Sequence, residues 1–215
     1  QNDVLARYLC GFCDASVIAY AACIYLVIVT DTGLRSSLVT SKTRVAPITK
    51  QSIPRLELLS AVLLARLIIT VQEAFEPILQ IDKILCWSDS TTALQWIKNE
   101  DKEWKPFVQS RANEIRKLVK PQVWSYVRSE YNPADIPTRE FKASELPISN
   151  NWWKGPTWLT SSVKDWPLMD DVDTSELTLE TLKELKITRT SHSCETSVNL
   201  LSVVNNTSLE ELIDC

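Results

Sequence analysis

Runs of apolar and β-branched residues dominate the first 45 positions of the chain and alternate with short polar breaks. One of these breaks, Asp31-Thr32-Gly33, has the residues of a tight turn. Apolar runs bounded by turn residues are typical of β-strands. The pattern therefore predicts three consecutive strands, at Leu9–Ser16, Tyr20–Thr30 and Leu38–Val45.

The part of the chain that follows alternates between helical and strand patterns. Ser52 and Pro54 form a helix-start signal, and the Leu- and Ala-rich segment after them ends before Pro77. Periodicity then predicts a helix at Ile53–Phe75, a strand at Ile84–Trp87, a helix at Ser90–Lys98, an amphipathic helix at Lys105–Lys120 and a strand at Val123–Val127. This order of elements predicts an α/β fold with a mixed sheet of five strands, flanked by helices.

The composition changes after about residue 146. A short stretch with Pro and Gly is crowded by Trp152, Trp153, Trp158 and Trp166. We therefore expect one domain over residues 1–146 and a packed, Trp-rich extension over residues 147–169. Residues 170–215 are acidic and rich in Ser and Thr, with one predicted helix at Ser175–Lys186. We expect this polar tail to be poorly ordered, or to be a linker toward a neighbouring domain.

The overall composition is that of a globular protein, because 45% of the 215 residues are hydrophobic and 23% are charged. The longest apolar run, Val17–Val29, has 13 residues, fewer than the roughly 17–25 that cross a bilayer, so we expect no membrane partner. The chain starts at Gln1 without a signal sequence or an initiator Met. We therefore expect a piece of a longer intracellular product, cytoplasmic or nuclear and not secreted.

The formal net charge of −4 is unevenly distributed along the chain. Residues 1–150 contain 18 Lys and Arg against 16 Asp and Glu, whereas residues 151–215 contain 5 against 11. If four acids of the first part bind metal, its remaining surface is about six charges positive, which suits a polyanionic partner.

Six cysteines raise the question of disulfides and metal sites. Cys13, Cys23 and Cys86 lie inside apolar runs, where a free thiol behaves as a small hydrophobic group. Cys10 and Cys13 have the C-x-x-C spacing of zinc sites, but no second pair of Cys or His follows, and His192 is the only histidine. We therefore expect buried strand cysteines.

Four acidic residues adjoin apolar segments. Asp14 and Asp89 each follow a buried strand, Glu57 lies among leucines in the long helix, and Asp135 closes a loop. A carboxylate beside buried residues costs free energy unless it is paired or binds a cation. Each acid also has a simpler explanation, since Asp89 can cap the helix that begins near Ser90 and Asp135 can form an Asx-turn.

These acids lie within five ordered motifs: Phe12-Cys13-Asp14-Ala15-Ser16, Ser41-Lys42-Thr43-Arg44-Val45-Ala46-Pro47, Ile53-Pro54-Arg55-Leu56-Glu57-Leu58, Trp87-Ser88-Asp89-Ser90 and Asn132-Pro133-Ala134-Asp135. The motifs resemble the RNase H-like segment of the BEL/Pao retrotransposon polyprotein. Trp153–Leu159 resembles the family stretch just after them, so the resemblance covers roughly residues 8–160. It implies an RNase H-like fold, lying between reverse transcriptase and integrase regions of the same polyprotein.

The resemblance also implies an activity, the hydrolysis of the RNA strand of RNA–DNA hybrids during reverse transcription. It implies a catalytic and metal-binding set of Asp14, Glu57, Asp89 and Asp135 for two Mg²⁺ ions, with Mn²⁺ as an alternative. Asp14 would bridge both ions and Asp135 would complete the site of the attacking water. Glu57 and Asp89 would hold the ion at the leaving oxygen.

Polar residues beside the acids are candidates for contacting the hybrid: Ser16, Ser90 and Asn132. Arg44, Lys50 and Arg55 are candidates for phosphate contacts, although solvated surface charge explains each of them as well. Many RNase H domains carry a His in the loop before the last Asp, whereas Ser129-Glu130-Tyr131 contains none.

Two other functions stay open. Asp31-Thr32-Gly33 matches half of an aspartic peptidase site, and this family has also carried a peptidase label. Such a peptidase needs two of these loops or a homodimer, because two carboxylates share one proton. The other alternative is a non-catalytic scaffold of the polyprotein that keeps the fold alone.

Overall fold

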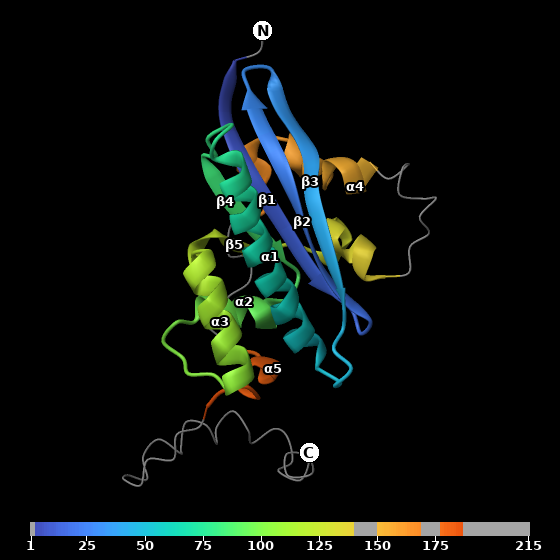
Figure 1. The fold of residues 1–215 in the computed structure, drawn as a ribbon, viewed down its shortest axis with the longest axis vertical. Coiled ribbons are helices and arrows are strands. Elements are labelled where there is room, and N and C mark those ends of the chain that lie inside the picture. Colours follow the sequence, from blue (N-terminus) through green and yellow to red (C-terminus); the bar gives the residue numbers. More distant parts are fainter. Residues whose placement is uncertain (1–2, 140–149, 169–176, 187–215) are drawn as a thin grey trace. The chain divides into compact units, whose positions relative to one another are not determined.

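A sheet of five strands forms the centre of the fold (Figure 1). The computed structural model describes residues 3–139, 150–168 and 177–186. Its strands are β1 (Val4–Ala15), β2 (Ala19–Thr30), β3 (Gly33–Val45), β4 (Lys83–Ser88) and β5 (Trp124–Tyr126). They lie in the order β3-β2-β1-β4-β5, with β1, β2 and β3 antiparallel, β4 parallel to β1, and β5 parallel to β4. The mixed five-stranded sheet predicted from the sequence is confirmed.

Two strands begin well before the positions that their apolar patterns predict. β1 begins at Val4, where the prediction has Leu9, and β3 begins at Gly33, where it has Leu38. The added residues pair with β2 along its whole length up to Thr30. Their side chains are partly exposed, so backbone pairing rather than apolar burial defines these strand ends. Such pairing leaves little hydrophobic pattern in the sequence.

The long helix α1 (Ile53–Phe75) has the bounds that its sequence predicts and packs against the sheet. It is long and apolar enough to cross a membrane by length and composition, but half of its most apolar window is buried inside the fold. The helix passes very close to β1 at Gly11, where a Cβ atom would lie 2.6 Å from Leu64 Cδ1. A larger residue at position 11 would therefore force the Leu64 side chain to move.

The shorter helices α2 (Thr91–Lys98) and α3 (Pro106–Leu118) complete one layer with α1, in front of the sheet in Figure 1. The core of this layer includes Leu9, Cys13, Ile24, Leu64, Trp96, Ile115 and Trp124. The short helix α5 (Leu179–Leu182) contacts α2, where the Thr181 hydroxyl donates to Gln95 Oε1. It lies inside the predicted helix at Ser175–Lys186 and is shorter, and residues 175 and 176 are outside the described residues.

The other face of the sheet is covered by the Trp-rich segment, which includes α4 (Asn150–Lys154) and two short 3₁₀ turns (Figure 1). A second core forms there from residues that include Phe12, Tyr25, Trp87, Trp152, Leu159 and Trp166. Tyr25 donates its hydroxyl to the Trp152 carbonyl at 2.8 Å, and Trp87 Nε1 donates to the Pro167 carbonyl at 2.8 Å. The predicted packed extension therefore contributes Trp152, Leu159 and Trp166 to the core on this face of the sheet.

The cysteines of the strands are free and buried, as expected. Cys10 belongs to the core of the Trp-rich face and Cys13 to the core of the helical face. Because the two thiols lie on opposite faces of β1, they cannot ligate one metal ion. The boundaries predicted at residues 146 and 169 stay predictions, and most of the predicted tail lies outside the described residues.

Candidate active site

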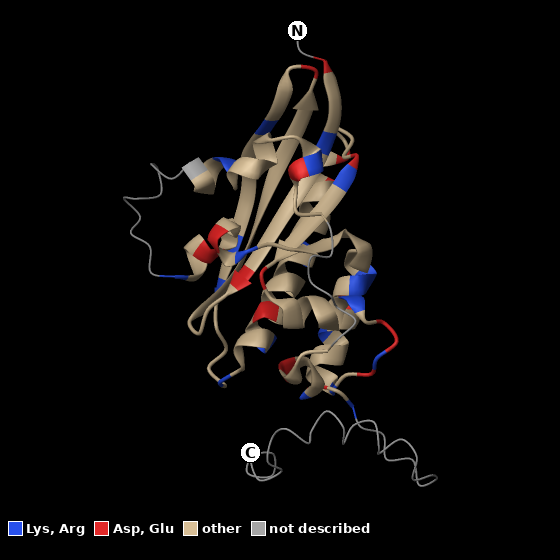
Figure 2. Cartoon of the chain, turned by 180° about the vertical axis from the view of Figure 1, so that it is seen from behind, with Lys and Arg blue, Asp and Glu red and all other residues tan. Residues whose placement is uncertain are grey.

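Three of the four predicted acids converge at one end of the sheet. Asp14 lies next to the end of β1, Asp89 directly follows β4, and Glu57 is in the second turn of α1. Their carboxylate groups each offer an oxygen, and these oxygens all lie within 4.8 Å of one another. Seen from behind, several acidic positions gather around this end of the sheet (Figure 2).

The topology explains why these residues meet. β1 and β4 are adjacent and parallel, with Cys13 opposite Ser88, so the residues that follow them emerge side by side. Helix α1 begins at Ile53 with Pro54 in its first turn, which places Glu57 near the helix start and close to the same edge. The carboxylates therefore come from three separate elements held by one core.

The three carboxylates are largely removed from water. Asp14 and Glu57 are 5% and 6% exposed. Burial raises the pKa of Asp14 from its usual 3.8 to about 6, and the charges of Asp89 and Asp135 add to the rise. Burial likewise raises the pKa of Glu57 from 4.5 to about 9, with Asp14 and Asp89 as further causes. The pKa of Asp89 is also raised by burial.

Hydrogen bonds orient two of the acids. The Thr138 hydroxyl donates to Asp14 Oδ2 at 2.5 Å. Asn132 Nδ2 donates to the Cys13 carbonyl at 2.9 Å and to Asp89 Oδ1 at 3.3 Å, so it ties the late loop to both strand ends. These bonds favour the ionised forms and lower the pKa values of Asp14 and Asp89 against the effect of burial.

Glu57 differs from the other two acids. Its Oε2 is buried and has no hydrogen-bond partner among the residues that the structure describes. A buried carboxylate oxygen without a donor is costly unless a cation or a proton satisfies it. Carboxylates are the hard oxygen ligands that Mg²⁺ and Mn²⁺ prefer. The three acids and this unsatisfied oxygen therefore fit a divalent cation.

The fourth predicted acid, Asp135, stands apart from the group of three. It lies in a 3₁₀ segment (Pro133–Thr138), and its Oδ1 accepts a hydrogen bond from Arg139 Nε at 2.6 Å. Its charge nevertheless contributes to the raised pKa values of Asp14 and Asp89, so it is near them. In this structure, Asp135 is paired with an arginine side chain and lies outside the three-carboxylate cluster.

The predicted substrate-contacting residues all serve the local structure. Ser16 Oγ donates to the Thr138 carbonyl at 2.7 Å, Ser90 caps α2 by accepting from the Ala93 N–H, and Asn132 caps the turn that holds Asp135. Each lies beside a carboxylate, so contact with a hybrid stays a prediction for all three. Asp89 precedes the capping residue and does not itself cap the helix.

Sequence reasoning missed Thr138 and Arg139, which contact Asp14 and Asp135. The signal for Arg139 was its spacing of four residues from Asp135, because opposite charges at this spacing meet on one helical turn. Thr138 follows Asp135 by three residues and donates to the Asp14 side chain across 124 positions of sequence. No local pattern predicts that contact.

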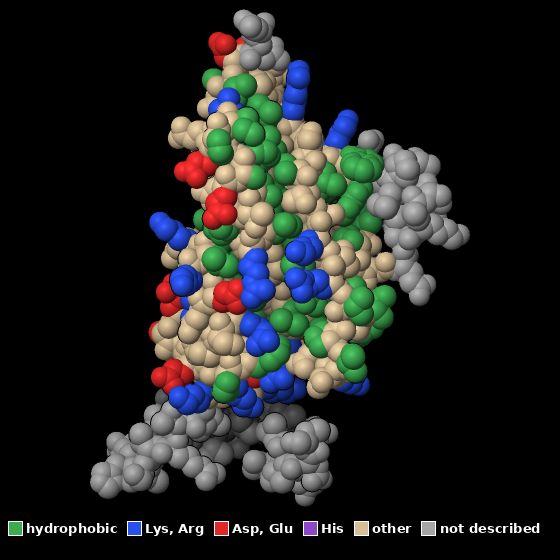
Figure 3. All heavy atoms as spheres, viewed as in Figure 1, with side chains coloured by type: hydrophobic (Ala, Val, Ile, Leu, Met, Phe, Trp, Pro, Cys, Tyr) green, Lys and Arg blue, Asp and Glu red, His purple; other side chains and the backbone are tan. Residues whose placement is uncertain are grey.

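Basic side chains gather on the helical face, over the region of α1 and α3 (Figure 3). A cavity of about 290 Å³ there is lined by Tyr20 and by Arg44, Arg66 and Arg111, among others. Glu114 pairs with Arg66 at 2.5 Å, which leaves a surplus of positive charge. Of the other predicted phosphate contacts, Lys50 is exposed, and Arg55 is bound to Glu184 at 2.7 Å.

Asp31 lies far from the acidic cluster. It is an exposed residue in the two-residue turn between β2 and β3, at the opposite end of the sheet from Asp14. Because β1 and β2 run side by side between the two positions, about 30 Å of strand separates them. The turn geometry favours the hairpin explanation of Asp31-Thr32-Gly33.

Comparison with known protein families finds a match to part of the chain. The model of the Pao retrotransposon-like RNaseH-like domain matches residues 2–90. The matched residues include Asp14, Glu57 and Asp89, whereas Asp135 lies beyond them. The described part of the chain has a mixed five-stranded sheet with helices on its faces.

Solved structures of RNase H enzymes are similar to part of this chain. RNase H1 of Halobacterium salinarum is 14% identical, with a TM-score of 0.38, over 59% of this chain and 90% of that chain. The N-terminal RNase H domain of Rv2228c from Mycobacterium tuberculosis is 12% identical, with a TM-score of 0.40, over 63% and 91%. LC11-RNase H1 in complex with an RNA/DNA hybrid is 13% identical, with a TM-score of 0.39, over 61% and 92%. A comparison with curated proteins gave no match.

Proposed function

We propose that this domain is a metal-dependent endonuclease, a ribonuclease H that hydrolyses the RNA strand of RNA–DNA hybrids during reverse transcription. The observation that carries the proposal is the convergence of Asp14, Glu57 and Asp89, with carboxylate oxygens within 4.8 Å of one another. Like charges this close are costly in a buried site unless cations bind there. The assignment of residues 2–90 to a retrotransposon-like RNase H-like family supports the same reaction.

The residues that would hold the metal are Asp14, Glu57 and Asp89, with Asp135 as a fourth. When bound, two Mg²⁺ ions would activate a water molecule and stabilise the negative charge that develops on the phosphate. Asp135 is available for this role only if its carboxylate exchanges Arg139 for the cation. Thr138 and Asn132 would keep Asp14 and Asp89 oriented during that exchange.

Recognition of the hybrid would use the rim of the carboxylate cluster and the basic face. Ser16, Ser90 and Asn132 lie beside the acids, where 2′-hydroxyl groups of an RNA strand would pass. The arginines around the cavity between α1, α3 and the sheet would contact phosphates. We further propose that the domain acts within a polyprotein, beside reverse transcriptase and integrase regions, in the cytoplasm or nucleus.

Two alternatives make different predictions. An aspartic peptidase would depend on Asp31, which lies in an exposed hairpin turn remote from the acidic cluster. A non-catalytic scaffold would not require the costly buried carboxylates Asp14 and Glu57. The retained acids therefore favour the nuclease over both alternatives.

The proposal is tested with the purified chain and one RNA strand, paired in turn with DNA and with RNA. We expect cleavage of the RNA–DNA hybrid in Mg²⁺ or Mn²⁺, none in excess chelator, and poor cleavage in Ca²⁺, whose looser coordination misplaces the water. Weak cleavage of the RNA–RNA duplex is the specificity control. Undiminished hybrid cleavage in chelator would contradict the metal-dependent mechanism.

A further inference from the structure

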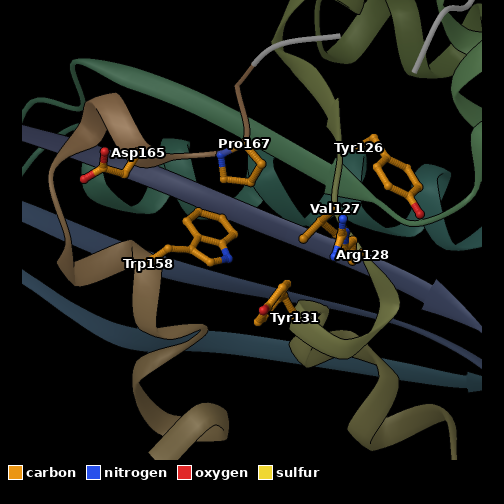
Figure 4. Close-up of a pocket in the computed structure, with 7 residues that line it drawn as sticks. All are labelled: Tyr126, Val127, Arg128, Tyr131, Trp158, Asp165 and Pro167. Carbon is orange, nitrogen blue, oxygen red and sulfur yellow. The ribbon is translucent and has the colours of Figure 1, made fainter. Parts of the chain in front are cut away.

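A cavity beside the candidate active site has no role in the proposed reaction. It has a volume of about 400 Å³, in the range of small-ligand sites, and is lined by Tyr126, Val127, Arg128, Tyr131, Trp158, Asp165 and Pro167. In Figure 4, Trp158 and Pro167 border it from the Trp-rich segment, and Val127, Arg128 and Tyr131 from the segment after β5. Asp165 lies at the far edge, with its carboxylate pointing away from the other labelled residues.

The cavity is connected to the carboxylate cluster by a short stretch of chain. The side chain of Ser129, which follows Arg128, hydrogen-bonds to Asp89. Asn132, which follows Tyr131, donates to the same carboxylate at 3.3 Å. One loop therefore presents Arg128 and Tyr131 to the cavity and Ser129 and Asn132 to the candidate metal site.

The aromatic wall of the cavity is held rigidly. The ring of Trp158 packs against Trp87 with 5.1 Å between centroids, against Phe12 at 5.8 Å and against Trp166 at 5.9 Å. Its Nε1 is buried and has no hydrogen-bond partner among the described residues. In Figure 4 this nitrogen lies on the side of the ring toward Val127 and Tyr131. Trp158 thus offers a fixed aromatic surface to the cavity.

Across the cavity, two side chains are accessible to a ligand. Tyr131 is 46% exposed. Arg128 is also exposed, and its ion pair with Glu130 is a long contact of 3.9 Å. Aromatic rings that stack on a base, together with a guanidinium group for the phosphate, are the usual features of sites for unpaired nucleotides. Arg128 and Asp165 at opposite edges would orient such a nucleotide with its phosphate toward Arg128.

We propose that this cavity binds an unpaired nucleotide that extends from the hybrid, with its base against Trp158 and Tyr131 and its phosphate at Arg128. This inference rests on the proposed ribonuclease function, because the hybrid is what brings the strand past Asp89. The cavity would then favour hybrids that end in a single-stranded extension over blunt hybrids. The Trp-rich segment would have a role in substrate selection as well as in packing.

The test compares the affinity of the full chain for a blunt hybrid and for the same hybrid with four unpaired nucleotides. Fluorescence anisotropy in excess chelator measures binding without cleavage, with separate arms for an extension on the RNA strand and on the DNA strand. Stacking a base on an aromatic side chain strengthens binding by about fivefold or more. We expect at least a fivefold gain in affinity from an extension in one arm.

Substitutions in the cavity test whether the gain in affinity arises from binding there. Tyr131→Ala and Arg128→Ala should abolish it, whereas Tyr131→Phe, which keeps the ring, should retain it. The matched controls are Trp153→Ala on α4 and Arg35→Ala on β3, both outside the cavity, and they should retain the gain. The inference is overturned if the gain in affinity is below fivefold in both arms. It is also overturned if the gain survives Tyr131→Ala, or if the control variants lose the gain as well. Circular dichroism checks that each variant is folded.

The same protein tests the proposed function separately. Cleavage of the blunt hybrid in Mg²⁺ depends on the carboxylates, whereas the affinity gain is measured without metal. If the wild-type chain binds the extension but cleaves nothing, the proposed function fails and the nucleotide site stands. If it cleaves the blunt hybrid but gains no affinity from an extension, only the nucleotide site fails.

Discussion

The carboxylate of Asp135 accepts a hydrogen bond from Arg139 Nε at 2.6 Å, whereas Asp14 and Asp89 accept hydrogen bonds from the neutral side chains of Thr138 and Asn132. The guanidinium group thus neutralises the one acid of the predicted set that stands apart. A divalent cation bound with Asp135 would compete with Arg139 for the same oxygen. Because the Arg139 side chain is 68% exposed, the ion pair contributes little and can be exchanged.

We therefore expect Arg139→Ala to lower the Mg²⁺ concentration needed for half-maximal binding by about two- to fivefold, as the loss of a weak surface ion pair allows. The measurement is a titration of the melting temperature with Mg²⁺, which requires no activity. Arg35→Ala, an exposed arginine on β3, is the control and should leave the midpoint unchanged. An unchanged or higher midpoint in Arg139→Ala would show that Arg139 does not compete with the cation.

The raised pKa values predict how stability depends on pH in the absence of metal. The pKa of Asp14 is about 6 in the folded chain and 3.8 ordinarily, and that of Glu57 is about 9 against 4.5. The folded state therefore holds protons that the unfolded state has lost. Stability should fall as the pH rises from about 4 through 6 for Asp14, and on toward 9 for Glu57. For Asp14 the loss is on the order of 3 kcal/mol at most.

Thermal melts from pH 5 to pH 9 in chelator measure this loss. Asp14→Asn and Glu57→Gln should each flatten the dependence, because an amide carries no charge to bury. Excess Mg²⁺ should flatten it in the wild type by compensating the carboxylates. Asp31→Asn is the control in an exposed turn and should behave as the wild type. A metal-free chain that is most stable at pH 9 would refute the burial argument.

The packing of the Trp-rich segment predicts that the stability of the sheet depends on residues beyond 146. Trp166 is 4% exposed and contacts Tyr8 and Trp87 edge to face. Trp166→Ala should reduce the free energy of unfolding by about 3–5 kcal/mol. Urea unfolding measures the change, with Trp153→Ala as the control, since Trp153 is 47% exposed. Equal losses in the two variants would mean that the segment adds no core.

The variant Asp31→Ala distinguishes the proposed nuclease function from the alternative peptidase function. We expect hybrid cleavage within a few-fold of wild type, and little change in stability, because the residue lies in an exposed turn. In an aspartic peptidase the same change would abolish proteolysis, because the two carboxylates of the dyad act together. Both activities are assayed on the one variant. The peptidase function would be established if the wild type shows pepstatin-sensitive proteolysis but no hybrid cleavage, and if Asp31→Ala abolishes that proteolysis.

The sequence predicts those parts of the molecule that local signals specify. Ser52, Pro54 and Pro77 bracket α1, whose observed bounds are the predicted ones. The succession of strands and helices along the chain and the acids at strand ends follow from apolar runs and motif order. The four-residue spacing of Asp135 and Arg139 is a local signal for their ion pair. The early start of β1 at Val4 could not be predicted, because it depends on pairing with β2 in the folded chain. The same holds for the contact between Thr138 and Asp14.

The most direct test of the account is the rate at which Asp14→Asn cleaves the RNA strand of a labelled RNA–DNA hybrid in saturating Mg²⁺. Asp14 contributes to the buried carboxylate cluster and is held by Thr138, so its loss removes a metal ligand and little packing. We predict a rate at least about 10²-fold below that of the wild type, with an unchanged circular dichroism spectrum. A folded Asp14→Asn protein that cleaves the hybrid at the wild-type rate would contradict the assignment of these carboxylates to catalysis.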